Sequence, residues 1–220
     1  MAVDDLAYAV RRSDRARRVR VRVEPDGSVE VVLPARAPER EAARAVSELR
    51  PWIDKRLADV AAARRAIARP AGTVPLLGES LVLREEPGRT RAHRRGDVLL
   101  VPAGVAARPA IERWYRRTAR AEITPRVADA CAAIGVAHDQ LTIRDQRTRW
   151  GSCSPAGALA FNWRLLLGPD AVLDYVVWHE ACHLSVFDHS RRFWDLLGRH
   201  RPGYAEPRRW LRDNGAALVL

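Results

Sequence analysis

His179, Glu180 and His183 form a His-Glu-x-x-His motif directly after an almost wholly apolar run, residues 172–178. Such a run predicts a helix that is buried on most sides, and polar side chains at the end of a buried helix need partners. Two histidines four residues apart lie about 40° apart around a helix, so one cation can bind both. Glu180 lies beside the pair and can accept a proton without occupying a ligand position. The motif therefore indicates a metal-dependent hydrolase site, against the alternative of two ordinary helix histidines beside a solvated glutamate.

A catalytic zinc ion usually has three protein ligands and one open position. Three of the six histidines of the chain fall within residues 179–189, which makes His189 the first candidate for the third ligand. On a continuous helix His189 would lie about 15 Å along the axis from the first histidine, so the helix must end before it. Ser185 and Asp188 are weak helix formers, Asp tolerates a left-handed backbone, and Ser190 can cap a new helix. We therefore expect the helix to break between Ser185 and His189.

Glu206 is the alternative third ligand, because some zinc hydrolases with a His-Glu-x-x-His motif take a glutamate from a later helix. Imidazole ligands suit Zn²⁺, although Ni²⁺, Co²⁺ or Mn²⁺ fits the same donor set.

The chain has 220 residues and a formal net charge of +11, and all but one of its 38 basic residues are arginines. Arginines neutralise phosphates, so the charge suggests contact with a polyanion such as nucleic acid. A coding preference for arginine and a solvated surface is the alternative explanation. The densest run of arginines spans residues 11–22, where Arg20 and Arg22 alternate with valines and are expected to share one face of a strand.

The three cysteines, at positions 131, 153 and 182, form no C-x-x-C pair and are interpreted as reduced packing residues. Residues 1–5 lack the basic and apolar regions of a signal peptide, and no apolar stretch approaches the ~20 residues of a membrane span. These features predict a cytoplasmic protein without membrane contact; its oligomeric state stays open.

Strand-like runs at 19–23 and 29–33 flank Pro25-Asp26-Gly27 and predict a β-hairpin. A helical stretch follows over residues 39–68, where Pro51 either starts a second helix or kinks a single one. Further strands are expected at 76–84 and 98–101, on either side of an Arg/Gly-rich loop over residues 85–96.

Residues 102–104 are the expected boundary between two lobes, a β-rich N-terminal lobe with a long helix (1–104) and a metal-binding lobe (105–220). In the second lobe we expect a helical segment over 109–134, interrupted at Pro125, and strands at 141–144, 147–153 and 158–165.

The strand from Ala158 to Trp163 immediately precedes the metal-binding helix, and zincins commonly use an edge strand there to hold an extended peptide. This places Asn162 and Trp163 near the substrate, although Trp163 could equally be a core residue. Gly151 suggests a bulge or a close backbone approach. Arg149 is a candidate for binding a substrate anion, or else braces the fold. Tyr204 is a candidate for donating to a developing oxyanion, or else is an ordinary buried tyrosine.

Longer stretches of the sequence closely resemble the YgjP-like metallopeptidase domain, which is related to SprT-like proteases. The resemblance covers residues 8 to 215 approximately and is most specific in the C-terminal half. The stretches that support it are Thr148 to Ser154, Leu159 to Leu165, Asp174 to Glu180, His189-Ser190 with Phe193-Trp194, and Pro202-Gly203-Tyr204 before Trp210-Leu211, with weaker matches at Arg11 to Ser13, Pro25 to Gly27, Trp52-Ile53 and Leu76 to Gly78.

The resemblance implies an α+β fold, with a zincin-like C-terminal lobe of helices and a small antiparallel sheet beside the β-rich N-terminal lobe. Carried over residue by residue, it makes His179, His183 and His189 the ligands of a zinc ion and Glu180 the catalytic acid/base. Ala181-Cys182 departs from the family, in which a bulkier residue commonly follows the glutamate.

These features predict a zinc metallopeptidase that acts on a peptide or protein substrate. Two alternatives stay open: a metal-dependent nucleotide phosphoanhydride hydrolase, in which arginines clamp phosphates, and a nucleic-acid-associated module with structural zinc. Glu180 argues against the last, because a closed structural site has no use for a base. The sequence contains no P-loop, no nucleophile elbow and no dinucleotide-binding fingerprint.

Overall fold

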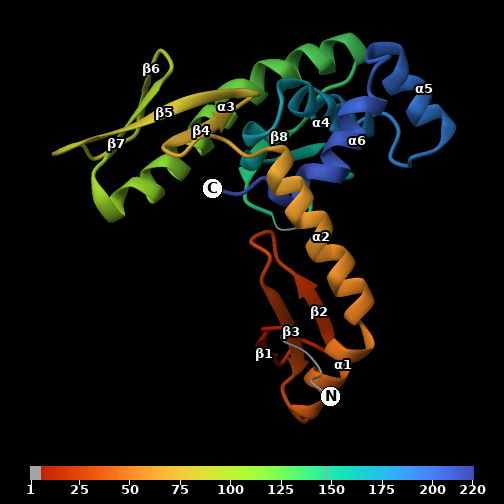
Figure 1. Ribbon diagram of the computed structural model, residues 1–220. Coiled ribbons are helices and arrows are strands. Elements are labelled where there is room, and N and C mark those ends of the chain that lie inside the picture. Colours follow the sequence, from red (N-terminus) through yellow and green to blue (C-terminus); the bar gives the residue numbers. More distant parts are fainter. Residues whose placement is uncertain (1–5, 147) are drawn as a thin grey trace. The chain divides into compact units, whose positions relative to one another are not determined.

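The computed structural model describes residues 6–146 and 148–220 (Figure 1). The N-terminal segment 1–5, used above for the prediction of a cytoplasmic protein, and Arg147, predicted to begin a strand, lie outside the described residues. None of the helices in the described ranges is both long and apolar enough to cross a membrane.

The chain divides into two compact units. The first contains the residues up to Ala68 together with Asp213–Val219, and the second contains Arg69–Arg212 and Leu220. The predicted lobe boundary at 104/105 does not coincide with this division and stays a prediction, because residues 69–104 group with the larger unit. The mixed α+β content that the sequence predicted is confirmed.

The first unit is built on a three-stranded sheet in the order β1-β3-β2. The predicted hairpin is confirmed as β2 and β3, which pair antiparallel, and β1 adds to β3 in parallel, a strand that the sequence analysis did not identify. Pro51 begins a second helix rather than kinking one, since it lies in the first turn of α2. The elements are β1 (Ala9–Ser13), β2 (Arg20–Val23), β3 (Val29–Pro34), α1 (Arg40–Glu48), α2 (Arg50–Ala66) and the 3-10 turn η3 (Gly215–Ala217).

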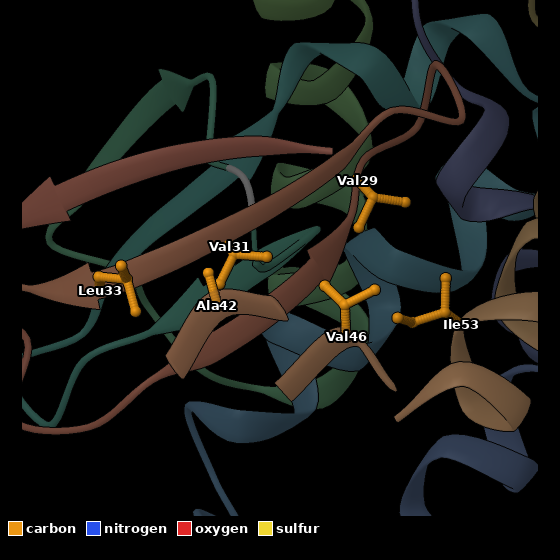
Figure 2. Packing of buried hydrophobic residues seen from close by; sticks show 6 residues of the cluster. All are labelled: Val29, Val31, Leu33, Ala42, Val46 and Ile53. Carbon is orange, nitrogen blue, oxygen red and sulfur yellow. The ribbon is translucent and has the colours of Figure 1, made fainter. Parts of the chain in front are cut away.

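Alternate residues of β3 form the core of this unit with the two helices (Figure 2). Their side chains point to one face of the sheet, as the two-residue period of a strand requires. The cluster consists of Val29, Val31, Leu33, Ala42, Val46 and Ile53.

In the second unit, a four-stranded sheet in the order β4-β5-β7-β6 precedes the long helix α3. The sequence predicted one strand over 76–84, but the chain reverses at Leu77-Gly78, where both residues have positive φ, and two antiparallel strands result. The expected loop over 85–96 likewise contains the end of β5 and all of β6. The strands are β4 (Thr73–Leu76), β5 (Glu79–Glu86), β6 (His93–Arg95) and β7 (Val98–Pro102), followed by the 3-10 turn η1 (Gly104–Ala106).

Helix α3 (Ala107–Ile134) runs through Pro125, where the sequence predicted an interruption. A proline inside a helix removes one backbone hydrogen bond and costs roughly 3 kcal/mol. Ile123 and Val127, on either side of it, are completely buried. We attribute the continuity of the helix to this packing, which offsets the local cost.

A second three-stranded sheet, in the order β8-β10-β9, packs against α3 and α4. It contains a parallel pair, β8 and β10, as well as the antiparallel pair β9 and β10, so it is not the purely antiparallel sheet that was expected. The predicted strand 158–165 ends at Asn162, whose side chain accepts a hydrogen bond from the Arg164 backbone and caps a 3-10 turn. The elements are β8 (Gln140–Arg144), β9 (Gly151–Cys153), β10 (Ala158–Asn162), η2 (Trp163–Leu167), α4 (Asp170–His183), α5 (Arg191–His200) and α6 (Ala205–Asn214).

The position of β10 corrects one expectation directly. The strand before the metal-binding helix was expected to be an edge strand, but β10 is central and both of its sides are paired. The edge strand next to α4 is β9, which contacts that helix.

Candidate metal centre

Helix α4 places His179 and His183 on one face at its C-terminal end. It begins after Pro169, has Asp170 in its first turn, and is buried along most of its length, as the apolar run predicts. His183 is 9% exposed and Glu180 only 6%, although both are polar. A buried carboxylate and a buried imidazole next to one another require compensation by hydrogen bonds or an ion.

The chain turns immediately after α4. The backbone N–H of Val186 donates to the carbonyl of Cys182, and His183 shares a 3.0 Å hydrogen bond between its Nδ1 and the Val186 carbonyl. Because the carbonyl can only accept, Nδ1 is the protonated nitrogen and Nε2 keeps its lone pair. The expected break before His189 is confirmed.

In the turn between α4 and α5, Ser190 and Asp188 do not play the roles that the sequence predicted. Ser190 precedes α5, but its side chain makes no capping hydrogen bond; instead its backbone N–H donates to Asp188 Oδ1 at 3.2 Å. Asp188 does not use the left-handed region, since Leu77 is the one non-glycine residue in the described ranges with positive φ.

This turn brings the third imidazole back to the first two. The Nε2 atoms of His179 and His183 are 3.2 Å apart, those of His183 and His189 are 3.2 Å apart, and those of His189 and His179 are 3.0 Å apart. Three nitrogens bound to one tetrahedral zinc at about 2.1 Å would be separated by about 3.4 Å. The triangle therefore has nearly the size that a single ion requires, and these residues form the one His/Cys/Asp/Glu cluster of metal-binding geometry found among the described residues.

The electrostatics of His179 and His183 favour the unprotonated form of both imidazoles. Burial, together with the neighbouring His183 and His189, lowers the pKa of His179 to about 3. Burial also lowers the pKa of His183. Neutral imidazoles are the form that binds a metal, so these two ligands are ready at neutral pH.

Aromatic rings from α5 hold the imidazoles in place. Phe193 stacks on His183 with ring centres 4.5 Å apart, and Trp194 stacks on His189 at 5.6 Å. The indole N–H of Trp194 also donates to the His189 carbonyl at 3.0 Å. At the C-terminal end of α5, Arg201 connects this helix to α4. Its guanidinium group donates to Asp174 and lies 4.0 Å from the Trp178 ring centre.

Glu180 lies at the wall of an open pocket of about 280 Å³. Burial raises its pKa to about 7, an effect that the nearby Arg149 guanidinium opposes. A carboxyl that titrates near neutrality can both accept and release a proton. The pocket is lined by Arg149, Gly151, Ser152, Cys153, His179, Glu180, His183, Phe187 and His189.

Gly151 allows Glu180 to reach this position. A Cβ atom at residue 151 would lie 2.5 Å from Glu180 Oε1 and 2.6 Å from its Cγ. Carbon and oxygen atoms do not approach so closely, so any larger residue would displace the carboxylate. Of the two interpretations of this glycine, the close backbone approach is correct.

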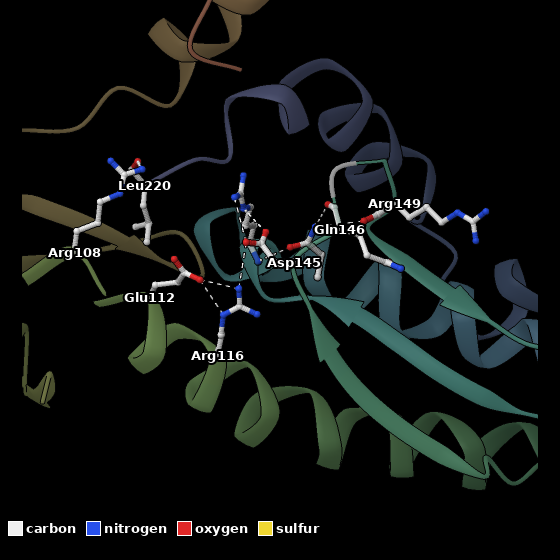
Figure 3. Close-up of polar contacts among 9 residues, drawn as sticks. Arg108, Glu112, Arg116, Asp145, Gln146, Arg149 and Leu220 are labelled. Atoms are coloured by element: carbon white, nitrogen blue, oxygen red, sulfur yellow. Dashed lines mark hydrogen bonds and ion pairs between the residues drawn. The ribbon is translucent and has the colours of Figure 1, made fainter. Parts of the chain in front are cut away.

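The remaining predicted site residues fall into two groups. Arg149 lines the pocket, and Figure 3 shows its side chain extending away from the ion-pair network around Asp145. Asn162 and Trp163 are each 1% exposed and do not line the pocket. Asn162 donates instead to the Gln146 and Arg149 carbonyls, at 2.7 and 3.3 Å, and so holds the backbone of both residues.

Tyr204 and Glu206 also lie away from the pocket wall. Tyr204 stacks on Trp194, at 5.4 Å between ring centres, and thus supports His189 through that indole. Glu206 is exposed on α6 and is not part of the three-histidine cluster.

Sequence reasoning missed three residues of the pocket wall. Ser152 and Cys153 come from β9, and Phe187 comes from the turn between the ligands, where it is 58% exposed. Cys153 was expected to be a packing residue; the pocket gives it a place beside Glu180, and burial raises its pKa to about 11. The one sequence signal for this part of the pocket was Gly151, at the start of β9, which suggested a close backbone approach.

Three converging imidazoles with a buried carboxylate beside them are typical of metal-dependent hydrolases. The family model of the YgjP-like metallopeptidase domain matches residues 17–214, and the chain therefore belongs to that family. The resemblance seen in the sequence is confirmed. Membership makes the chain a metallopeptidase-type hydrolase, a class that uses a divalent metal ion and acts on peptides.

Comparison with solved structures finds the metallopeptidase zymogen abylysin of Pyrococcus abyssi, with 21% sequence identity and a TM-score of 0.37. The similarity covers 41% of this chain and 92% of that one. Comparison with curated proteins finds no match.

Proposed function

We propose that this chain is a zinc metallopeptidase in which His179, His183 and His189 bind the ion and Glu180 is the general acid/base. The observation that supports it most is the triangle of Nε2 atoms, with sides of 3.0 to 3.2 Å, next to a carboxyl whose pKa is raised to about 7. When bound, the ion would supply the Lewis acidity that polarises a carbonyl and acidifies water.

Glu180 would accept a proton from the attacking water and pass it to the leaving amine. Its burial favours this role, because a carboxyl near its pKa exchanges protons in both directions. Arg149, at the pocket wall, would attract a substrate carboxylate or carbonyl and hold Glu180 partly ionised.

The edge strand β9 is our candidate for the substrate-binding strand, in place of β10. It pairs with β10 on one side only, and all three of its residues line the pocket. An extended peptide can add to such an edge through main-chain hydrogen bonds. Phe187, exposed beside the pocket, would contact an apolar side chain of that peptide.

The pocket wall favours a peptide over a nucleotide. A triphosphate needs several cationic groups to balance its charge. Among the residues that the structure describes, Arg149 is the single arginine that lines the pocket.

The decisive experiment compares the zinc-loaded protein with its Glu180→Gln variant on denatured protein and on nucleoside triphosphates. We expect the wild type to release peptides, and the variant to keep one zinc per chain while its turnover falls by at least a hundredfold. Glu206→Gln is the matched control, because Glu206 is exposed on α6 and was the alternative ligand; it should change neither property. Turnover by Glu180→Gln, or release of phosphate in place of peptides, would refute the proposal.

The assignment of the third ligand needs its own comparison. His189→Ala should lower zinc affinity by tenfold or more, whereas Glu206→Ala should leave it unchanged. The reverse result would make Glu206 the ligand.

A further inference from the structure

The positive charge of the chain is concentrated in one short segment. Residues 8–23 contain seven arginines and one aspartate, a formal charge of +6, whereas the whole chain has +11. A coding preference for arginine would raise arginine everywhere in the sequence. The concentration in sixteen residues therefore requires a local explanation.

The strand register gathers three of these arginines on one face of the β1-β3-β2 sheet. Arg11 and Arg20 lie opposite Val32, one on each side, and Arg22 lies opposite Glu30. Residues directly opposite one another on paired strands point to the same face. Val31 and Leu33 point to the other face, where they pack with α1 and α2.

The burial of Val32 agrees with arginine stems that lie along the sheet. It points away from the helices, yet it is only 3% exposed. The aliphatic stems of the flanking arginines can cover it while their guanidinium groups reach solvent.

The charge on this face is largely uncompensated. Glu30 accepts a hydrogen bond from Arg11 at 2.9 Å and lies 4.0 Å from Arg22. Arg20 is exposed and makes no hydrogen bond or ion pair with another described residue, and the same holds for Arg15, Arg17 and Arg18 in the connection between β1 and β2. We call these six arginines, at positions 11, 15, 17, 18, 20 and 22, the basic face.

The form of the basic face indicates which polyanion fits it. Arginines two residues apart on a strand are separated by about 6.7 Å and are held by a pleated sheet, and guanidinium groups bind phosphates with paired hydrogen bonds. An amphipathic element that binds a membrane surface also inserts large apolar side chains into the bilayer. The strand positions on this face carry no exposed large apolar side chain. These positions are Ala9, Arg11, Ser13, Arg20, Arg22, Glu30, Val32 and Pro34.

We propose that the basic face binds the phosphate backbone of nucleic acid without reading its bases. The site is separate from the three histidines in sequence and does not depend on the function proposed for them.

The experiment measures binding of a fluorescein-labelled 20-base-pair DNA duplex to the full chain by anisotropy, between 50 and 200 mM salt. The test variant replaces Arg15, Arg17, Arg18 and Arg20 with alanine. These side chains make no hydrogen bond or ion pair with another described residue, so the variant should keep its fold, with a small loss of stability where the Arg20 stem no longer covers Val32. The matched control removes the same charge elsewhere, at the exposed Arg84, Arg95, Arg199 and Arg209. A second variant places lysine at the four test positions.

We expect the test variant to bind at least tenfold more weakly at 100 mM salt. Its slope of log K against log salt should be smaller by about 3 to 4, since each lost phosphate contact removes about 0.9. The control should bind within about threefold of the wild type, and the lysine variant should recover the wild-type slope.

Three results would overturn the proposal. The first is a wild type that does not bind DNA, and the second is an equal loss in the test and control variants. The third is binding to vesicles containing phosphatidylserine that depends on these four arginines while DNA binding does not, which would assign the face to a membrane surface.

Discussion

The sheets β1-β3-β2 and β8-β10-β9 have the same topology but very different surfaces. In each, the first strand pairs in parallel with the third and the second pairs antiparallel with it, so the third strand is central. β5, β6 and β7 repeat this arrangement. The second strand is an edge in both sheets: β2 presents Arg20 and Arg22, whereas β9 presents small side chains from Gly151 onward.

Under the two proposals above, the side chains of the edge strand, and not the topology, decide what each sheet binds. Long charged side chains on β2 keep other groups at a distance and attract anions. A glycine on β9 lets the Glu180 carboxylate approach the backbone, which no arginine-bearing strand would allow. The central strands are alike, because β3 and β10 are both largely buried.

The largest expected effect is a loss of folding stability when a buried side chain of either central strand is truncated. Phe161 in β10 and Leu33 in β3 are both completely buried. Phe161→Ala should lower the free energy of unfolding by about 3 to 5 kcal/mol and Leu33→Ala by about 2 to 5 kcal/mol, as measured by urea unfolding. Only Phe161→Ala should also lower peptide hydrolysis by the folded protein, because Phe161 is the partner of Gly151 across the strands. Equal losses of activity in both variants would contradict the separation of roles.

The second prediction concerns the small residue on β9. Gly151→Ala should lower kcat by about a hundredfold, because the new Cβ displaces Glu180, while zinc content stays at one per chain. Combined with Glu180→Gln it should cause no further loss, since both changes remove the same group. Gly203→Ala is the control, because a Cβ there meets nothing within 4 Å. A normal kcat in Gly151→Ala would show that Glu180 does not need this approach.

The third prediction uses the buried carboxyl. Its pKa of about 7 in the folded protein lies above the ordinary value of 4.5, so the folded state holds an extra proton between these values. In metal-free protein this makes Glu180 increasingly destabilising as pH rises from 4.5 to 7, by about 3 kcal/mol at most. Histidines 179 and 183, whose pKa values are lowered, act in the opposite direction below pH 6.5.

The contribution of Glu180 is isolated by comparing chelated wild type with chelated Glu180→Gln. We expect the variant to gain up to about 3 kcal/mol of stability relative to the wild type at pH 8, and much less at pH 5. A difference that does not vary with pH would mean that this carboxyl titrates normally.

The smallest effect is expected on the arginine-bearing sheet. The Arg11–Glu30 pair is partly exposed, with 49% of the arginine side chain and 22% of the glutamate side chain accessible. Arg11→Ala should therefore change the free energy of unfolding by less than about 1 kcal/mol and leave peptide hydrolysis intact. A larger loss of stability would indicate that the stem of Arg11 covers Val32 as an essential part of the core.

The sequence was most informative where the structure is local. All three imidazoles and Glu180 fall within eleven residues, so helix geometry and one predicted break were enough to bring them together. The hairpin β2–β3 was also predictable, because alternation of valines and a Pro-Asp-Gly turn are short-range signals.

Features that depend on distant packing were harder to predict. The turn at Leu77 requires a positive φ that leucine rarely adopts, and the helix through Pro125 depends on burial at Ile123 and Val127. Asn162 and Trp163 were placed near the substrate because an edge strand was expected there. Strand β8 pairs in parallel with β10, so β10 is central instead. The residue pattern of a single strand does not show which other strands pair with it.

The short spacing of the three imidazoles has a consequence for how the protein matures. The loops that connect the three histidines span four to ten residues, and closing them costs little chain entropy. The Glu180 carboxylate reaches its final position later, because strand 151–153 must first pair with β10 and pack against α4. Ion capture can thus precede assembly of the working cleft. Under the function proposed above, a newly synthesised chain would bind zinc before it could cleave a peptide.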